Sequence, residues 1–285
     1  MSVRLVISDV MWGRIEPLMP ADPVRGRRWA EHRRALEAIA WKYRTCAPWR
    51  DLPEELGSFK TAHKRLLRRA IDGTWARIFA AVLASADADG DIGWAVSVDS
   101  TVCRAHQHVA GARKGDTGRG EPADRAPGRS RGGPGTRIHL AGDSNARPSA
   151  IVLTVGQAGD APAFTAVTAA IRVPRTVCGR PRTRPDVVLA DRAYSSRAIR
   201  AHLRERHVRA VVPQPVDRVR HRERGGPNGG RPPAFDADTY KGRNTVERCI
   251  ACLKQWRGPA MRCDKLAVAH QAALHLAAIL IRVRR

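Results

Sequence analysis

Two short apolar runs that each stop at an aspartate constrain the fold more than any other feature of this chain. Residues 93–99 end on Asp99, and residues 186–191 end on Asp191. Both runs have the length and the valine content of buried β-strands. A carboxylate at the end of a buried strand costs desolvation free energy unless it is paired or bound to a metal ion. The two aspartates are therefore the first candidates for a functional site.

The segments around these runs predict further strands and helices. Strands are expected at residues 136–141, 149–155 and 208–212, with a turn at 142–145. Helices are expected at residues 160–171, from Ser195 or Ser196 to about 207, and at 240–256. Basic stretches rich in glycine or proline predict loops at residues 111–135, 173–185 and 217–235. Strands that alternate with helices in this order predict an α/β fold with a mixed sheet.

The first 88 residues predict a separate helical region, which an acidic linker at residues 87–91 joins to the α/β region at 89–285. One helix is expected at residues 29–43, and a second runs from an N-cap at Ser58 to a stop at Gly73. The second helix has an apolar face and a polar face: Phe59, Ala62, Leu66 and Ala70 against Thr61, Lys64, Arg65 and Arg68. A pair of helices with a basic second member resembles a helix-turn-helix reader of DNA. A basic face that is simply solvated is the alternative.

The charge of the chain indicates its partner. Lysine and arginine number 51 against 27 acidic residues, a net charge of +24. A charge of this size favours binding to polyanions, of which nucleic acid is the commonest, although a basic surface without a ligand is the alternative. No membrane span is expected, because the most apolar stretch, residues 266–281, contains two histidines and a glutamine and is typical of a buried helix. Six cysteines without framework spacing predict reduced thiols in the cytosol.

The predicted helix at residues 240–256 carries four polar side chains on one stripe. At about 100° per residue, Tyr240, Arg243, Glu247 and Lys254 lie within roughly 60° of one another. An apolar band lies beside them: Val246, Cys249, Ile250, Leu253 and Trp256. Glu247 would therefore be held at the border of the core, where it can reach a substrate. A solvated face with an i,i+4 pair between Arg243 and Glu247 is the alternative.

Asp99, Asp191 and Glu247 together are the predicted catalytic and metal-binding residues. Carboxylate oxygens are the ligands that Mg²⁺ requires, and two such ions serve phosphodiester displacement. Each acid taken alone is better explained as a cap or a surface ion pair. Cysteine is a weaker candidate ligand: Cys249 and Cys252 have zinc-like spacing, with Cys263 downstream, but buried thiols explain them better. His106 and His108 are expected to face phosphate or solvent.

Three segments resemble the motifs of the bacterial insertion-sequence DDE transposases. Residues 96–101 resemble the first aspartate motif, residues 188–196 the second, and Tyr240, Arg243, Glu247 and Lys254 have the spacing of the Y-R-E-K signature. Residues 47–53 resemble the family's N-terminal DNA-binding region. The departures from the family pattern are mild and leave the three acids intact: Phe59, Cys103, Arg137 and Arg192.

The resemblance implies an RNase H-like catalytic core preceded by the helical DNA-binding region. It also implies two Mg²⁺ ions, which Mn²⁺ can replace, held by Asp99, Asp191 and Glu247. Such an enzyme cleaves DNA at the ends of its element and joins the 3′ ends to target DNA. The implied DNA contacts come from Arg243, Lys254, Tyr240 and Arg192, together with the helix face at Thr61, Lys64, Arg65 and Arg68.

The implied partners are the terminal inverted repeats of the element, the target DNA and a second copy of the chain during the reaction. The implied location is the bacterial cytoplasm, on the nucleoid. Two rival hypotheses remain: an RNase H-like endonuclease that does not join strands, and a catalytically inactive DNA-binding repressor derived from a transposase. A metal-dependent strand-joining assay distinguishes all three.

Overall fold

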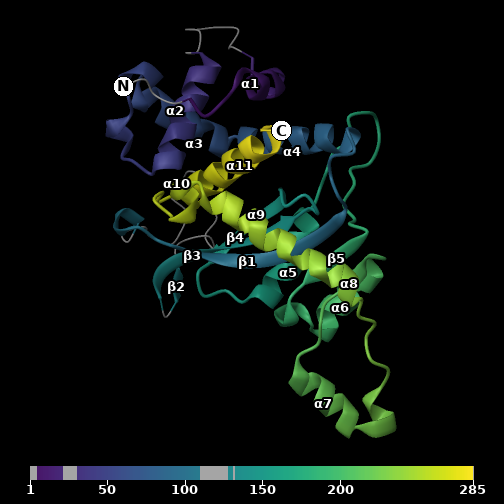
Figure 1. The fold of residues 1–285 in the computed structure, drawn as a ribbon. Coiled ribbons are helices and arrows are strands. Elements are labelled where there is room, and N and C mark those ends of the chain that lie inside the picture. The colour runs from purple at the N-terminus through teal and green to yellow at the C-terminus, as the bar shows by residue number, and fades with distance from the viewer. Residues whose placement is uncertain (1–4, 22–30, 110–127, 131, 285) are drawn as a thin grey trace.

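A mixed β-sheet forms the centre of the protein in the computed structural model, which describes residues 5–21, 31–109, 128–130 and 132–284 (Figure 1). Within these ranges the sheet has six strands, whose bounds are β1 (Ala95–Arg104), β2 (Gly128–Ser130), β3 (Gly133–Gly142), β4 (Pro148–Val155), β5 (Val187–Ala190) and β6 (Arg209–Val211). Their order is β4-β3-β1-β5-β6, with the short β2 paired to the start of β3. Strands β1, β3 and β4 are antiparallel neighbours, whereas β5 and β6 run parallel to β1. This arrangement is RNase H-like, as expected.

Helices cover both faces of the sheet. On one face lie α5 (Asp160–Ala170) and α6 (Arg197–Glu205), and on the other lies α9 (Asn244–Lys254). Two residues of β1 point to opposite faces of the sheet. The Ser97 hydroxyl lies 3.1 Å from the Thr245 hydroxyl in α9, whereas the Ser100 hydroxyl donates to Asp160 in α5 (2.5 Å). All four residues of β5 are buried, as expected for a parallel strand that is covered on both faces.

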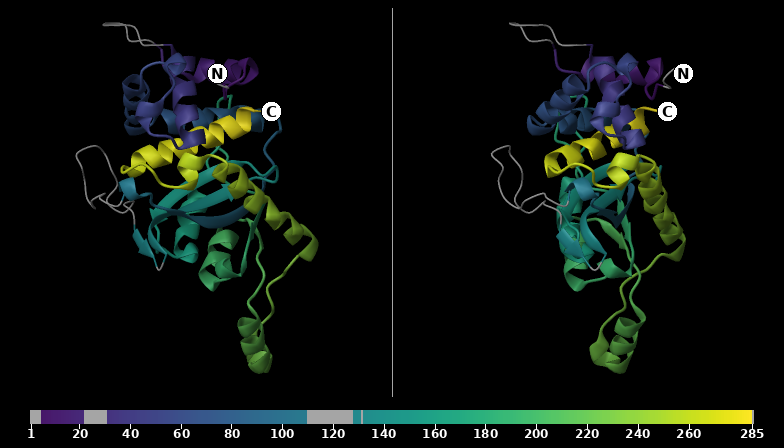
Figure 2. Two further views of the ribbon diagram at one scale, coloured as in Figure 1. Left: turned by 60° about the vertical axis from the view of Figure 1, so that its left-hand side comes forward. Right: turned by 90° about the vertical axis from the view of Figure 1, so that its left-hand side faces the viewer.

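A layer of helices packs above the sheet and contains both the first and the last long helices of the fold (Figures 1 and 2). Its N-terminal members are α1 (Asp9–Ile15), α2 (His32–Thr45), α3 (Phe59–Ile71) and α4 (Thr74–Ala88). The C-terminal helix α11 (Ala267–Val283) packs against all four of these helices and also contacts β4. One continuous hydrophobic core therefore extends from Ile7 to Val283. Among the helices that the structure describes, α11 included, none is long and apolar enough to cross a membrane.

Most of the predicted elements are confirmed. Ser58 precedes α3 as predicted, but its side chain makes no capping hydrogen bond within the described residues. At the start of α6, the Ser196 side chain caps the helix by accepting a hydrogen bond from the N–H of Ile199. Apolar residues at helical or alternating spacing identified these elements because the same residues are buried in the core. The predicted loop at 111–135 was partly wrong, since residues 128–130 and 133–135 belong to β2 and β3; residues 110–127 and 131 lie outside the described residues.

The predicted loop at 217–235 was also wrong at its start. Residues Val216–Arg224 form helix α7, which projects away from the sheet and the helical layer (Figure 2). All nine residues of α7 are described, and none of them is buried. Because this helix has no apolar stripe to bury, hydrophobic periodicity could not indicate it.

The helix expected at 240–256 consists of two pieces. Helix α8 (Ala237–Tyr240) and a 3₁₀ turn (Lys241–Arg243) lead into α9. The apolar band of α9 lies in the core as predicted, with Ile250 partly buried against it. The predicted alignment of Tyr240 with Glu247 assumed one regular helix. A 3₁₀ turn lies between them instead, and Tyr240 packs against Val187, Leu189 and Val211.

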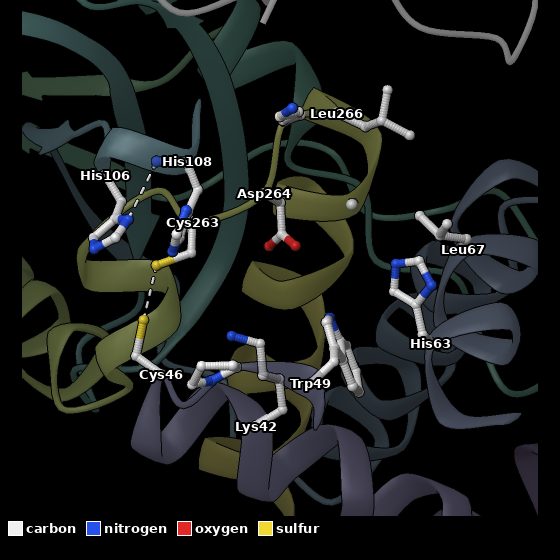
Figure 3. A pocket seen from close by; sticks show the side chains of 13 residues that line it. Lys42, Cys46, Trp49, His63, Leu67, His106, His108, Cys263, Asp264 and Leu266 are labelled. Atoms are coloured by element: carbon white, nitrogen blue, oxygen red, sulfur yellow. Dashed lines mark hydrogen bonds between the residues drawn. The ribbon is translucent and has the colours of Figure 1, made fainter. Parts of the chain in front are cut away.

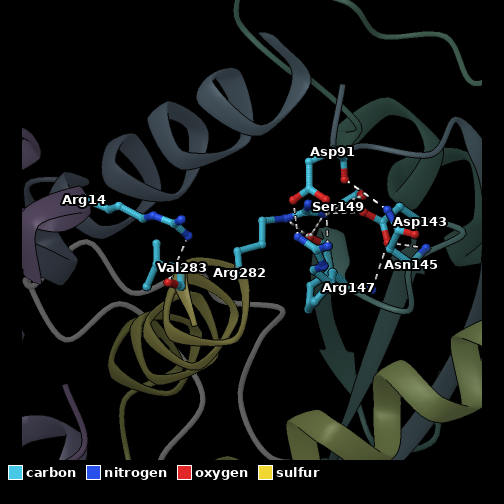
Figure 4. Close-up of polar contacts among 9 residues, drawn as sticks. Arg14, Asp91, Asp143, Asn145, Arg147, Ser149, Arg282 and Val283 are labelled. Atoms are coloured by element: carbon cyan, nitrogen blue, oxygen red, sulfur yellow. Dashed lines mark hydrogen bonds and ion pairs between the residues drawn. The ribbon is translucent and has the colours of Figure 1, made fainter. Parts of the chain in front are cut away.

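A polar cluster lies beneath the C-terminal end of α11 (Figure 4). The guanidinium of Arg282 donates to the Asp143 carboxylate (2.9 Å) and to the carbonyl of Pro148 (2.9 and 3.1 Å). The side chains of Arg282 and Asp143 are 1% and 0% exposed. This fully buried ion pair fixes the end of α11 to the turn between β3 and β4.

Gly258 permits the close contact between α10 (Arg257–Ala260) and α2. A Cβ at Gly258 would meet Tyr43 Cδ1 at 2.5 Å and its backbone Cα at 3.2 Å. We therefore expect Gly258→Ala to destabilise the protein by about 1–3 kcal/mol, measured by urea denaturation, because overpacking forces backbone shifts. Gly13→Ala in α1 is the matched control: among the described residues, no atom outside its own stretch of helix lies within 4 Å of the added Cβ, so stability should stay equal or rise. Equal effects of the two substitutions would contradict this packing.

Candidate active site

The strand register places Asp99 and Asp191 side by side. The last residues of the parallel β1–β5 ladder are Val98 and Ala190, and each aspartate is the next residue of its chain. Asp191 ends β5 as predicted, and its carboxylate caps the following 3₁₀ turn by accepting the N–H of Ala193 (2.9 Å). Asp99 was expected at a strand end and lies instead in the middle of β1, because β1 continues to Arg104 in its pairing with β3. Asp99 nevertheless lies beside Asp191, as predicted.

Glu247 joins the site through Arg243. The Arg243 guanidinium donates from Nη1 to Glu247 Oε1 (2.5 Å) and from Nη2 to Asp99 Oδ2 (3.2 Å). Arg243 is 19% exposed and Glu247 52%, so the pair lies at the border of the core. The structure thus brings two predicted acids together on one guanidinium, with the third acid adjacent in the sheet.

The surroundings of Asp99 make its negative charge costly. Burial raises the pKa of Asp99, and the charges of Asp191 and Asp160 raise it further. The hydrogen bond from the Ser100 N–H (2.8 Å) and the charge of Arg243 act in the opposite direction. A carboxylate held among other carboxylates attracts a cation, which Arg243 supplies in this structure.

Asp160 is a fourth carboxylate that the sequence did not identify as part of the site. It accepts a hydrogen bond from the Ser100 hydroxyl and pairs with Arg137 (3.1 Å). His139, whose pKa burial lowers to about 4, lies 3.8 Å away. In the sequence Asp160 is only the first residue of a predicted helix. The one hint of its role was that this helix follows the strand predicted at residues 149–155, which belongs to the same sheet.

Tyr194 is the second missed residue. Its ring is buried against Phe164, and within the described ranges its hydroxyl has no hydrogen-bond partner. Burial, followed by the charges of Asp160, Asp99 and Asp191, raises the pKa of Tyr194 strongly, so the hydroxyl keeps its proton. A buried polar group without a partner, close to three acids, is what remains when a site is built to hold a further polar species.

The donor set fits a hard divalent cation in its chemistry. Asp99, Asp191 and Glu247 offer only carboxylate oxygens, which Mg²⁺ and Mn²⁺ prefer. In the part of the chain that the structure describes, no three His, Cys, Asp or Glu side chains are close enough to hold a metal ion. Arg243 binds one oxygen of Glu247 and one of Asp99 in this structure.

The other predicted contact residues of this region are spread around the carboxylates. Arg192 is exposed directly after Asp191, and Lys254 is exposed at the far end of α9. Tyr240 packs against the edge formed by Val187, Leu189 and Val211. Of these four described residues, Arg243 is the one that is hydrogen-bonded to the acids.

The predicted DNA-contacting residues of α3 line one cavity of about 340 Å³: Thr61, Lys64, Arg65 and Arg68. Its lining residues belong to α3, α4 and the segments next to them in the helical layer. Arg69 and Arg77 line the same cavity and were not predicted. Arg69 is buried, with its guanidinium 2.6 Å from His32 Nδ1, and burial lowers its pKa to about 10. Arg69 belongs to neither of the two faces predicted for this helix.

The zinc alternative finds no support. All six cysteines lie in the described part of the chain and are free thiols. Cys249 is fully buried, and burial raises its pKa. Cys263 contacts Cys46 from the helical layer, not Cys249 or Cys252. His106 and His108 line a cavity together with Cys46 and Cys263 (Figure 3).

The sequence matches transposase family models over both of its regions. Residues 92–282 match the family model "Transposase DDE domain", and residues 7–79 match "Putative transposase of IS4/5 family". The chain is similar to the "Putative transposase for insertion sequence element IS402" of Burkholderia cepacia, with 34% identity over 160 residues, which are 56% of this chain and 65% of that protein. It is also similar to the "Putative transposase for insertion sequence element IS6501" of Brucella ovis, with 27% identity over 52% of this chain and 98% of the relative.

Among solved structures, a "Mos1 transposase paired-end complex with left transposon end" aligns over 83% of this chain and 82% of its own, with 14% identity and a TM-score of 0.26. The family assignment comes from the sequence match, which extends from residue 92 to residue 282 of 285 and so covers more than half of the protein. The chain belongs to the transposase DDE domain family.

Proposed function

We propose that this protein is the transposase of an insertion sequence, which cleaves DNA at the ends of its element and joins the 3′ ends to target DNA. The observation that supports this most directly is the arrangement of three carboxylates. Asp99 and Asp191 follow paired residues of parallel strands, and Arg243 bridges Asp99 to Glu247. Family membership supports the same reaction class.

Asp99, Asp191 and Glu247 would hold two Mg²⁺ ions, which Mn²⁺ can replace. When bound, such ions activate the attacking hydroxyl or water and stabilise the leaving oxygen of a phosphodiester. The residues of the chain position these groups: β1 and β5 fix the aspartates, and α9 fixes Glu247. Arg243, once released from its two acids, would be free to contact a phosphate of the DNA.

The remaining predicted contacts divide between two surfaces. Arg192, Lys254 and Tyr240 would position the DNA backbone near the acids, and the α3 face at Thr61, Lys64, Arg65 and Arg68 would bind the terminal repeats. Pairing of the two DNA ends would involve a second copy of the chain. The proposed division into residues 1–88 and 89–285 assigns recognition to the first region. Helix α11 packs against the helices of the first region, so point substitutions test this division better than truncation does.

Helix α7 is expected to supply affinity for DNA without sequence preference. Arg220 and Arg224 are exposed on it, and phosphate contacts carry no sequence information. Replacing both by Gln should weaken binding several-fold on terminal-repeat DNA and on scrambled DNA alike. It should also flatten the dependence of log affinity on log salt by about 0.9 for each phosphate that the variant no longer neutralises.

Paired salt titrations on the two DNAs measure this effect. Glu223→Gln on the same helix is the matched control, because it removes a negative charge and should strengthen binding to both DNAs. A loss confined to the terminal-repeat DNA would show that α7 reads sequence.

The function is tested by incubating the protein with a short duplex carrying the repeat that flanks its coding region and with a supercoiled plasmid. We expect a covalent repeat–plasmid product that requires Mg²⁺ and disappears with EDTA. Cleavage without joining would identify an endonuclease instead. Binding without cleavage would identify a repressor.

A further inference from the structure

Two cysteines that are distant in the sequence meet between the helical layer and the sheet. The Sγ atoms of Cys46 and Cys263 are 2.8 Å apart in a hydrogen bond between thiols, although 217 positions separate the residues (Figure 3). Cys46 ends α2, and Cys263 follows α10. Both are half-buried. Two thiols that point toward one another satisfy the first geometric requirement of a disulfide.

Both thiols are held by ordered backbone. Cys46 is the C-cap of α2 in the left-handed region, with φ of 60°, and its N–H donates to the carbonyl of Lys42 (2.8 Å). Cys263 directly follows Arg262, whose N–H donates to the carbonyl of Arg104 at the end of β1 (3.0 Å). Arg262 is itself buried and donates to the Thr136 hydroxyl (2.6 Å). To form the bond, the two sulfurs must approach from 2.8 Å to the roughly 2.05 Å of a disulfide, a shift of under about 1 Å.

A small oxidant can reach the pair. Cys46 and Cys263 line a cavity of about 540 Å³, together with Trp49 and His63 from the helical layer. Figure 3 shows the two sulfurs at one side of this cavity, below His106 and His108. The cavity is large enough to admit a peroxide, so the thiols are accessible even though neither is fully exposed.

The electrostatic environment distinguishes Cys46 from the buried cysteines. The hydrogen bond from Cys263, assisted by the charges of Lys42 and Arg257, lowers the pKa of Cys46 to about 6. The same contact raises the pKa of Cys263, which keeps its proton. Burial raises the pKa of Cys103 to about 12. A thiolate is the reactive form of cysteine, so Cys46 is the nucleophile of the pair and Cys103 is inert.

We propose that Cys46 and Cys263 are a redox-modification site, at which hydrogen peroxide converts the two thiols into a reversible disulfide. The Cys46 thiolate attacks one peroxide oxygen, so that an S–O bond forms, the O–O bond breaks and water leaves after protonation. The Cys263 thiol then attacks the Cys46 sulfur, the S–S bond forms, and the S–O oxygen leaves as a second water. With hydrogen peroxide, two thiols and one peroxide give one disulfide and two waters.

The bond would tie the helical layer to the part of the chain that carries the carboxylates. Cys46 belongs to α2, whereas the segment of Cys263 is hydrogen-bonded to the end of β1, the strand of Asp99. The closed loop spans the 217 positions between the two cysteines, and a cross-link restricts the unfolded chain most when the loop is long. This inference goes beyond the proposed function and does not depend on it.

The test uses the full chain, reduced and then treated with one equivalent of hydrogen peroxide. We expect free thiols to fall from six to four, a peptide linking Cys46 to Cys263 in mass spectrometry after alkylation, and a melting temperature that rises by several degrees. Dithiothreitol should reverse all three changes. Cys46→Ser and Cys263→Ser should each abolish the linked peptide, and circular dichroism of each variant checks that it is folded.

Cys178→Ser and Cys252→Ser are the matched controls, because Cys178 is the exposed thiol and Cys252 a half-buried thiol on α9. Both should retain the Cys46–Cys263 link. The proposal is overturned if both cysteines are recovered alkylated after peroxide treatment while another thiol is oxidised. A metal ion that copurifies with the pair and protects it from peroxide would overturn it as well.

Discussion

Replacing Asp191 by Asn should reduce metal-dependent DNA cleavage by on the order of 10³-fold or more, since one anionic ligand of a two-metal site contributes several kcal/mol to transition-state stabilisation. The fold should survive the change. Asp191 caps the turn at residues 192–194 by accepting the N–H of Ala193, and an asparagine oxygen can accept the same bond. DNA binding should be nearly intact or slightly tighter, because a repulsive negative charge is removed.

Asp186→Asn is the matched control, since Asp186 directly precedes the first residue of β5, whereas Asp191 directly follows the last. The Asp186 side chain is 74% exposed and pairs with Arg182 (2.9 Å), so its loss should leave cleavage unchanged. Single-turnover cleavage of end DNA measures both variants. Cleavage by Asp191→Asn at nearly the wild-type rate would show that Asp191 serves only as a helix cap.

Replacing Arg282 by Met should destabilise the protein by about 3–5 kcal/mol, because it leaves the fully buried Asp143 carboxylate without its partner. Burial lowers the pKa of Arg282, and the charge of Asp143 opposes this shift, so Asp143 helps to keep Arg282 charged. The Pro148 carbonyl and the Ser149 hydroxyl lose their donor as well (Figure 4). The expected fall in melting temperature is roughly 10 °C.

Lys241→Met provides the comparison. Lys241 pairs with Asp238 at 2.7 Å, closer than Arg282 pairs with Asp143, but the two side chains are 79% and 90% exposed. Its loss should leave the melting temperature unchanged within error, since solvent screens an exposed ion pair. Similar effects of the two substitutions would mean that the burial of Asp143 does not determine the contribution of its ion pair.

The sequence predicted those parts of the fold in which local pattern and burial agree. Strands β3 and β4, helix α5 and the apolar band of α9 were identified because apolar spacing reports which residues face the core. Pairing between distant segments is not encoded locally. The continuation of β1 beyond Asp99 depends on its partner β3, which is why Asp99 was expected at a strand end.

The candidate site was predictable where its residues belong to one local sequence motif. Arg243 and Glu247 are one helical turn apart, and their ion pair follows from spacing alone, but the bridge from Arg243 to Asp99 crosses 144 positions. Asp160 and Tyr194 were missed because they reach the carboxylates through the packing of α5 and the turn after β5. Buried arginines such as Arg69 and Arg282 were missed as well, since a charged side chain is expected outside unless its partner is known.

The most direct test of the three-acid site is anomalous diffraction from crystals of the protein grown with Mn²⁺ and terminal-repeat DNA. Manganese is detected by its own scattering, so its position needs no assumption about the reaction. We expect a peak within bonding distance of carboxylate oxygens of both Asp99 and Asp191, with Arg243 released from Asp99, and no peak there in Asp191→Asn. A peak elsewhere, with the Arg243–Asp99 pair intact at saturating Mn²⁺, would contradict the assignment of these acids as metal ligands.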